Sequence, residues 1–115
     1  MSLNFWTILR MLAALATAAT GLLAFIKPDA VYGFTGLTAE GARAVSEIRA
    51  VFGGLFIALG IAPFFLDATA YRMLGYGYLA IAVTRAISIV IDQSYAQSNW
   101  ISLTIEIVFG IILAI

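Results

Sequence analysis

The sequence predicts an all-α membrane protein whose four transmembrane helices form an up-down-up-down antiparallel bundle. Three observations predict this fold class. Hydrophobic residues make up 63% of the 115 residues and charged residues only 10%, whereas roughly a quarter of the residues in a soluble domain are charged. The mean hydropathy is +1.07. The apolar residues fall into four long runs that fill the chain, so we expect a single domain over residues 1–115.

Each apolar run is long enough for a membrane-spanning helix, which needs about 17–25 residues. We expect helices because a helix satisfies its backbone hydrogen bonds within one segment, as lipid requires. The first run ends at Lys27-Pro28-Asp29, where proline cannot continue a helix, and the third ends at Asp92. The expected helices cover residues 4–26, 44–66, 71–91 and 99–115.

The connections between the runs predict how the helices are arranged. Residues 67–71 and 92–99 form short connections, and residues 27–43 form a longer one. Short connections make consecutive helices antiparallel neighbours. The start of the second helix, the end of the third and the start of the fourth are therefore expected on one side of the membrane.

The composition excludes several classes of function. Six basic and six acidic residues give a net charge of zero, which excludes a basic nucleic-acid binder. The chain has no cysteine and no histidine, so disulfides, thiol catalysis, histidine-held haem and the usual zinc sites are excluded. We expect no cofactor, no metal and no nucleic-acid partner. The absence of a recognisable nucleophile and base argues against an enzyme.

The charged residues inside the apolar runs form the candidate site. An ionised side chain in a membrane is costly unless it finds a partner or reaches the interface. Arg85 and Glu106 each lie seven residues inside a helix end, so both are expected about 10 Å from the same membrane face. The second helix brings two more charges to that face. The predicted polar cluster, which is also the candidate ligand site, comprises Glu47, Arg49, Arg85 and Glu106.

Three interpretations of this cluster stay open. Charge pairs between helices often fix only their register. Two arginines can form paired hydrogen bonds to a phosphate or carboxylate, which indicates a site for an anionic headgroup. A buried Glu106 can also relay protons or ions.

Small residues at helical spacing predict where the helices touch. Small residues every four positions let two helices approach closely. The fourth helix carries such a stripe, and the second helix carries two on adjacent faces. The expected helix-packing residues are Gly53, Gly54, Ala58 and Gly110.

Two segments resemble a known family. The first runs from Glu47 to Gly54, with an acidic residue followed by Arg-Ala, an aromatic residue and Gly-Gly. The second is Thr84-Arg85-Ala86, which leads to the polar end of the third run at Asp92. Both are similar to domain-of-unknown-function family 4345, a family of small bacterial four-helix integral membrane proteins. The resemblance implies the four-helix topology and a role for Glu47, Arg49 and Arg85, and it implies no particular activity.

These observations favour a structural or accessory subunit that packs against itself or against a larger membrane complex. The alternative is a binder or transporter of a small molecule or lipid that uses the Arg/Glu cluster near one membrane face. Membrane lipid is the expected partner in both cases, and the bacterial inner membrane is the expected location. The basic residues are balanced between the two faces, so the positive-inside rule does not choose an orientation.

Overall fold

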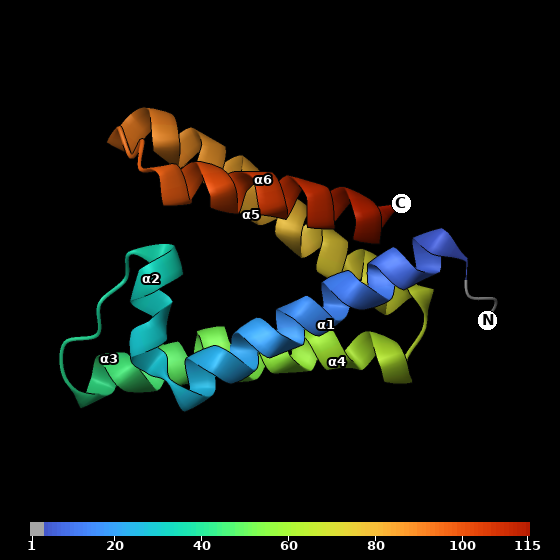
Figure 1. Ribbon diagram of the computed structural model, residues 1–115, viewed down its shortest axis with the longest axis horizontal. Helices are drawn as coiled ribbons and strands as arrows, with labels where there is room; N and C mark the ends of the chain where they lie inside the picture. The colour runs from blue at the N-terminus through green and yellow to red at the C-terminus, as the bar shows by residue number, and fades with distance from the viewer. Residues whose placement is uncertain (1–3) are drawn as a thin grey trace.

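The computed structural model describes residues 4–115, and this part of the chain is helical without strands (Figure 1). Four of its helical segments are long and apolar enough to cross a membrane: Phe5–Ile26, Ala42–Phe65, Ala68–Asp92 and Gln97–Ala114. The elements in chain order are α1 (Phe5–Ile26), a 3-10 turn (Pro28–Ala30), α2 (Val31–Thr35), α3 (Ala42–Glu47), a π-helix (Ile48–Leu55), α4 (Phe56–Phe65), α5 (Ala68–Asp92) and α6 (Gln97–Ala114).

Polar side chains set the ends of the long helices. The Asn4 side chain accepts a hydrogen bond from the backbone N–H of Thr7 at 2.8 Å and caps α1. The Asp67 side chain accepts one from the N–H of Thr69 at 2.9 Å. Because this cap satisfies a free N–H of the first turn, α5 begins at Ala68, three residues before the start expected from the apolar run. Gln93 ends α5 in a left-handed conformation, with φ of 52°.

The helices form two tightly packed antiparallel pairs. In the first pair α1 lies against the π-helix and α4. A Cβ atom on Gly60 would lie 2.5 Å from the carbonyl oxygen of Ala14, and one on Gly21 would lie 2.7 Å from that of Gly53. In the second pair α5 lies against α6, and a Cβ atom on Gly75 would lie 2.5 Å from the backbone nitrogen of Ala114. Glycine therefore allows backbone-to-backbone approach in both pairs.

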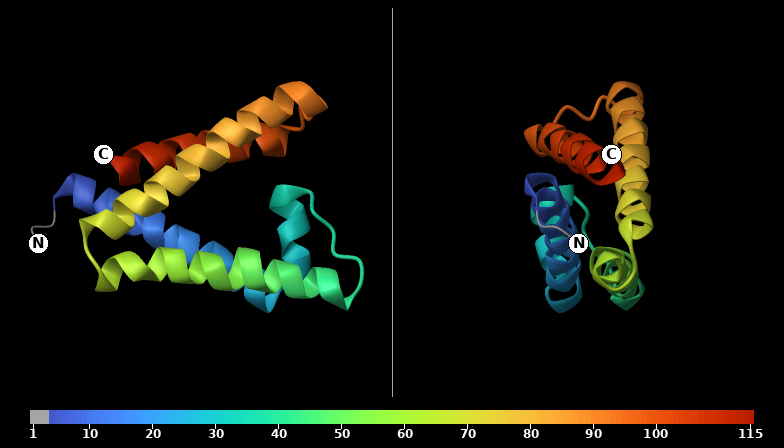
Figure 2. Two further views of the ribbon diagram at one scale, coloured as in Figure 1. Left: turned by 180° about the vertical axis from the view of Figure 1, so that it is seen from behind. Right: turned by 90° about the vertical axis from the view of Figure 1, so that its right-hand side faces the viewer.

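The two pairs meet at one end of the molecule and diverge toward the other (Figures 1 and 2). The main core lies at the closed end, where Arg10 also donates hydrogen bonds to the backbone carbonyl oxygens of Ile112 and Ile115 and so ties α1 to the end of α6. The core combines buried residues of both pairs, namely Ala13, Ala14, Tyr71, Leu74 and Leu113.

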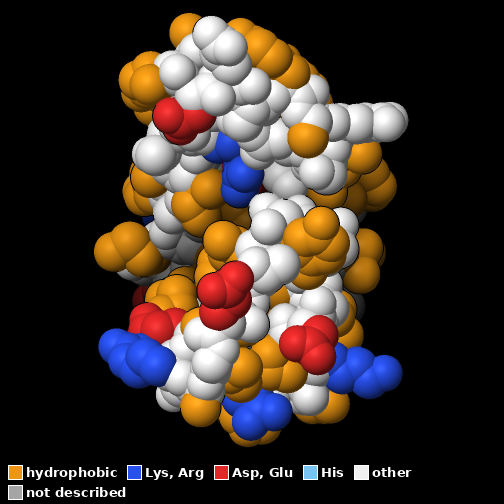
Figure 3. All heavy atoms as spheres, turned by 90° about the vertical axis from the view of Figure 1, so that its left-hand side faces the viewer, with side chains coloured by type: hydrophobic (Ala, Val, Ile, Leu, Met, Phe, Trp, Pro, Cys, Tyr) orange, Lys and Arg blue, Asp and Glu red, His pale blue; other side chains and the backbone are white. Residues whose placement is uncertain are grey.

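At the open end, α2 rises from the first pair toward α6 and occupies the space between the pairs (Figure 1). A second small core holds α2 in place and consists of Ala24, Val31 and Ile48. Figure 3 views this end and shows acidic and basic side chains gathered over its lower half, where α3 and the end of α1 lie. Charged side chains therefore gather on the part of the open end that the first helix pair forms.

Of the four small residues expected at helix interfaces, two are buried and two are exposed. Gly53 is buried, and a Cβ atom there would lie 3.0 Å from Cβ of Phe25 in α1. Gly110 is buried against Leu79 of α5. Gly54 and Ala58 are exposed. Since α1 packs on the face that carries Gly53 and Gly60, the neighbouring small face stays on the outside of the molecule.

Candidate functional site

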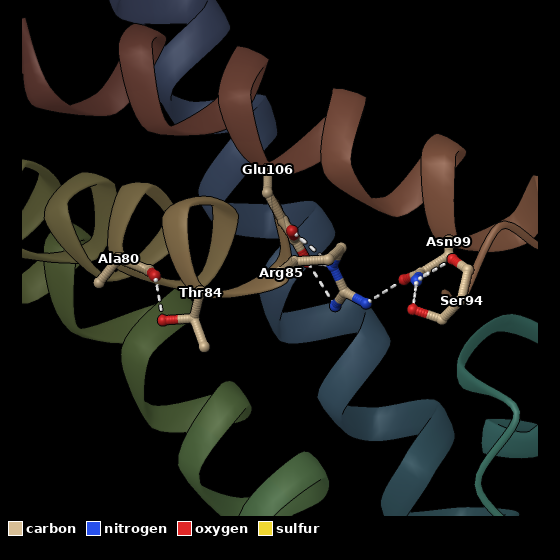
Figure 4. Close-up of polar contacts among 6 residues, drawn as sticks. All are labelled: Ala80, Thr84, Arg85, Ser94, Asn99 and Glu106. Atoms are coloured by element: carbon tan, nitrogen blue, oxygen red, sulfur yellow. Dashed lines mark hydrogen bonds and ion pairs between the residues drawn. The ribbon is translucent and has the colours of Figure 1, made fainter. Parts of the chain in front are cut away.

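The most buried charged group in the described residues is the Glu106 carboxylate, which pairs with Arg85 across the α5–α6 interface (Figure 4). Arg85 Nε donates to both carboxylate oxygens of Glu106, at 2.8 and 3.0 Å, and Arg85 Nη2 donates to Oε2 at 2.7 Å. The Glu106 side chain is 10% exposed and that of Arg85 is 31% exposed. This paired geometry is the strong form of an arginine–carboxylate contact.

A second polar side chain holds the guanidinium in place. Asn99, in the first turn of α6, accepts a hydrogen bond from Arg85 Nη1 at 2.7 Å. Its own amide donates to the backbone oxygen of Ser94 at 3.0 Å and to the Ser94 hydroxyl at 3.1 Å. The α5–α6 connection therefore fixes Asn99, and Asn99 fixes Arg85. Figure 4 shows this chain of contacts running from Glu106 to Ser94.

The structure brings together two of the four charged residues expected in the cluster. Glu47 accepts a hydrogen bond from Arg43 one turn away on α3, and both side chains are exposed. Arg49 is exposed and forms no ion pair within residues 4–115. Both lie on the first helix pair at the end where the pairs diverge, so they do not join Arg85 and Glu106 on the second pair. The Arg49–Gly54 part of the family-like segment lies on the π-helix.

A cleft of about 470 Å³ lies between the two helix pairs, and Glu106 is part of its lining. The cleft is open to the outside and draws side chains from both pairs and from α2. Apolar residues dominate the walls, which is typical of sites that bind small molecules. The lining residues are Thr20, Leu23, Gly33, Phe34, Phe56, Tyr78, Ser98, Ile101, Ser102, Ile105, Glu106 and Phe109.

The polar part of this lining lies largely along α6. Ser98, Ser102 and Glu106 recur every four residues and so follow one face of the helix. Neither serine hydroxyl makes a hydrogen bond with the residues that the structure describes. Across the cleft, the Tyr78 hydroxyl is hydrogen-bonded to the Thr17 hydroxyl, and the Tyr78 ring packs edge-on against Phe109. The cleft thus offers two free hydroxyl groups and one carboxylate to a ligand.

The sequence analysis predicted Arg85 and Glu106 at one depth within a cluster of four charged residues, but it left out three residues of the site. Asn99 falls at the start of the expected fourth helix, and neither Ser98 nor Tyr78 was among the candidate residues. The spacing of Ser98, Ser102 and Glu106 is the signal that could have revealed the polar face of α6. Among residues 4–115, the structure holds no group of three or more acidic residues that could bind a metal ion.

Comparison with known proteins returns one family. The family model described as Domain of unknown function (DUF4345) matches residues 5–115. No curated protein and no solved structure matches the chain. The match covers all four long helices and therefore both the ion pair and the cleft.

Proposed function

The chain belongs to the family Domain of unknown function (DUF4345), and on that premise we propose that it is a membrane-embedded protein that binds one lipid or lipid-like small molecule in the cleft between its helix pairs. In this proposal the four long helices cross a bacterial inner membrane in alternating directions. Their outward faces carry exposed apolar side chains such as Phe5, Phe65 and Val90, which suit contact with lipid tails.

The observation that carries the proposal is the cleft lined by Glu106. Its volume of about 470 Å³ lies within the usual range of about 300–1,000 Å³ for ligand sites. The α2 helix stands between the pairs, and a paired carboxylate and two free serine hydroxyls line the gap. Such polar groups in an apolar site orient an amphipathic ligand.

Filling the cleft should remove the ligand. We expect Ser102→Phe to abolish retention of a defined small molecule, because the ring takes the space that the ligand occupies. Thr104→Phe is the matched control, since Thr104 is exposed on the same helix and does not line the cleft. The measurement is native mass spectrometry of protein extracted gently from its own membrane, with identification of the bound molecule.

The wild type and the two variants together test the binding proposal. The proposal requires a single bound species in the wild type and in Thr104→Phe, and an empty Ser102→Phe. It fails if the wild type carries only the mixed lipids of the membrane, or if the same species survives in Ser102→Phe.

A second candidate is an accessory subunit that assembles with another copy of this chain. The observation that favours it is the exposed position of Gly54 and Ala58. A Cβ atom on Gly54 would come no closer than 3.9 Å to the nearest atom, the carbonyl oxygen of Arg49 in its own helix. Small residues on an outward helix face allow a second helix to approach closely in a membrane.

This candidate predicts a dimer that Gly54→Leu and Ala58→Leu dissociate. Each leucine would separate the Ala42–Phe65 segments of the two copies. Gly77→Leu is the control, because Gly77 lies on a different helix and has nothing within 4 Å of its Cβ position. The measurement is energy transfer between labelled copies in vesicles at increasing dilution. A wild type that is monomeric at every dilution rules out self-assembly and leaves the cleft proposal standing.

A further inference from the structure

The charge balance of the cleft limits what can enter it. Glu106 is the one charged residue in its lining, and Arg85 already neutralises that carboxylate through both oxygens. The charged residues that the sequence placed nearby, Glu47 and Arg49, lie on the other helix pair and contribute no lining. The lining therefore holds no free cation that could receive a phosphate or carboxylate.

An anionic headgroup would meet the Glu106 carboxylate directly. Like charges brought together at a desolvated site are strongly unfavourable. A cationic headgroup would share Glu106 with Arg85 and leave a net positive charge, which is costly in an apolar site. An uncharged headgroup leaves the net charge of the Arg85–Glu106 pair at zero. The best fit is one that donates a hydrogen bond, because each carboxylate oxygen can accept more bonds than Arg85 supplies.

The serine hydroxyls add further hydrogen-bonding groups for an uncharged ligand. Ser102 lies one turn from Glu106, and Ser98 lies one turn further toward the open end. Their hydroxyls can each donate and accept a hydrogen bond. A ligand with several oxygen atoms can therefore follow the polar face of α6, while its hydrocarbon part contacts Ile101, Ile105 and Phe109.

We infer that the cleft binds an uncharged, hydroxyl-bearing lipid, such as a diacylglycerol, and rejects anionic lipids. This inference rests on the proposed binding function and adds the chemical class of the ligand. The free hydroxyl of the lipid donates to Glu106, and its ester oxygens accept from Ser102 and Ser98. Arg85 acts as a positioning residue that orients the carboxylate through its hydrogen bonds to both oxygens and does not contact the ligand.

Two lipids that differ only at the headgroup test the inference. Dioleoylglycerol and dioleoyl phosphatidic acid share their chains, and the phosphate replaces the free hydroxyl. Equal amounts are offered to the purified protein in a phosphatidylcholine nanodisc, and the retained lipids are counted by native mass spectrometry. We expect dioleoylglycerol to exceed phosphatidic acid by about tenfold or more, since charge repulsion opposes the anion. Ser102→Phe should remove the dioleoylglycerol.

A reversal of selectivity provides the sharper test. In Glu106→Gln the carboxylate is gone and Arg85 carries an uncompensated positive charge beside the cleft. We expect this variant to retain phosphatidic acid in preference to dioleoylglycerol, a reversal that a merely structural role for Glu106 would not produce. Thr104→Gln, on the exposed face of α6, should keep the wild-type preference and controls for the added amide.

The outcomes separate the inference from the proposed function. Phosphatidic acid bound by the wild type in a manner that Ser102→Phe abolishes overturns the inference and leaves the binding function intact. Equal, low retention of both lipids by the wild type and Ser102→Phe overturns both. Wild-type preference for dioleoylglycerol that persists unchanged in a folded Glu106→Gln overturns the role of the carboxylate.

Discussion

Gly60→Ala is expected to destabilise the protein by about 2–3 kcal/mol, the upper part of the range for overpacked interiors. The added Cβ would lie 2.5 Å from both the carbonyl oxygen of Ala14 and the backbone nitrogen of Ala18. Both atoms belong to the α1 backbone, so no side chain can rotate away to relieve the contact. The two helices must separate, and the contacts along their whole interface weaken. Unfolding followed by circular dichroism during a denaturing-detergent titration measures the loss.

Gly77→Ala is the matched control for this prediction. Gly77 also lies inside a long helix, but nothing lies within 4 Å of its Cβ position. The same substitution should therefore be neutral or stabilising, by up to about 1 kcal/mol, through the higher helix propensity of alanine. Equal effects at Gly60 and Gly77 would contradict the close packing of α1 on α4.

The second large effect is expected at the ion pair. Glu106→Leu leaves Arg85 without its anion, and breaking a buried pair costs about 3–5 kcal/mol. We expect a loss near 3 kcal/mol, because the Arg85 side chain is 31% exposed and can turn toward the surface. Arg85→Leu should also be destabilising, since the Glu106 carboxylate is then buried without a cation. The same unfolding titration applies to both variants.

The double variant distinguishes a paired charge from two independent ones. Arg85→Leu with Glu106→Leu removes both charges, so it should be less destabilised than either single variant. The exposed pair Arg43 and Glu47 serves as the control, and its removal should change stability by no more than about 0.5 kcal/mol. Additive losses from Arg85→Leu and Glu106→Leu would show that the two side chains do not interact.

The sequence predicted the elements of this fold better than their arrangement. Apolar runs and their polar ends locate the helices, because length and hydropathy are local properties. Arg85 and Glu106 meet because the short α5–α6 connection fixes the relative height of two neighbouring helices. The same reasoning placed Glu47 and Arg49 in the cluster with Arg85 and Glu106, but they lie on the other helix pair. The depth of a residue along its helix does not reveal that the two helix pairs diverge.

The face of a helix is equally hard to predict when it carries two stripes of small residues. Gly53 and Gly54 are adjacent in sequence, yet α1 packs on the first and leaves the second exposed. The choice depends on Gly21 and Phe25 of α1, which the local pattern of the second span does not contain. The cleft follows from the divergence of the pairs and from the position of α2, so no single segment predicts it.

Site-directed photocrosslinking tests most directly whether the cleft holds a ligand. Ile105 and Ile107 lie on the same helix and are 46% and 41% exposed, but Ile105 lines the cleft and Ile107 does not. A photoreactive phenylalanine analogue is placed at one position or the other, the intact membrane is irradiated, and the mass of each adduct is determined. The account predicts one defined small-molecule adduct at position 105 and a mixture of bulk lipids at position 107. The same lipid mixture at both positions would contradict it.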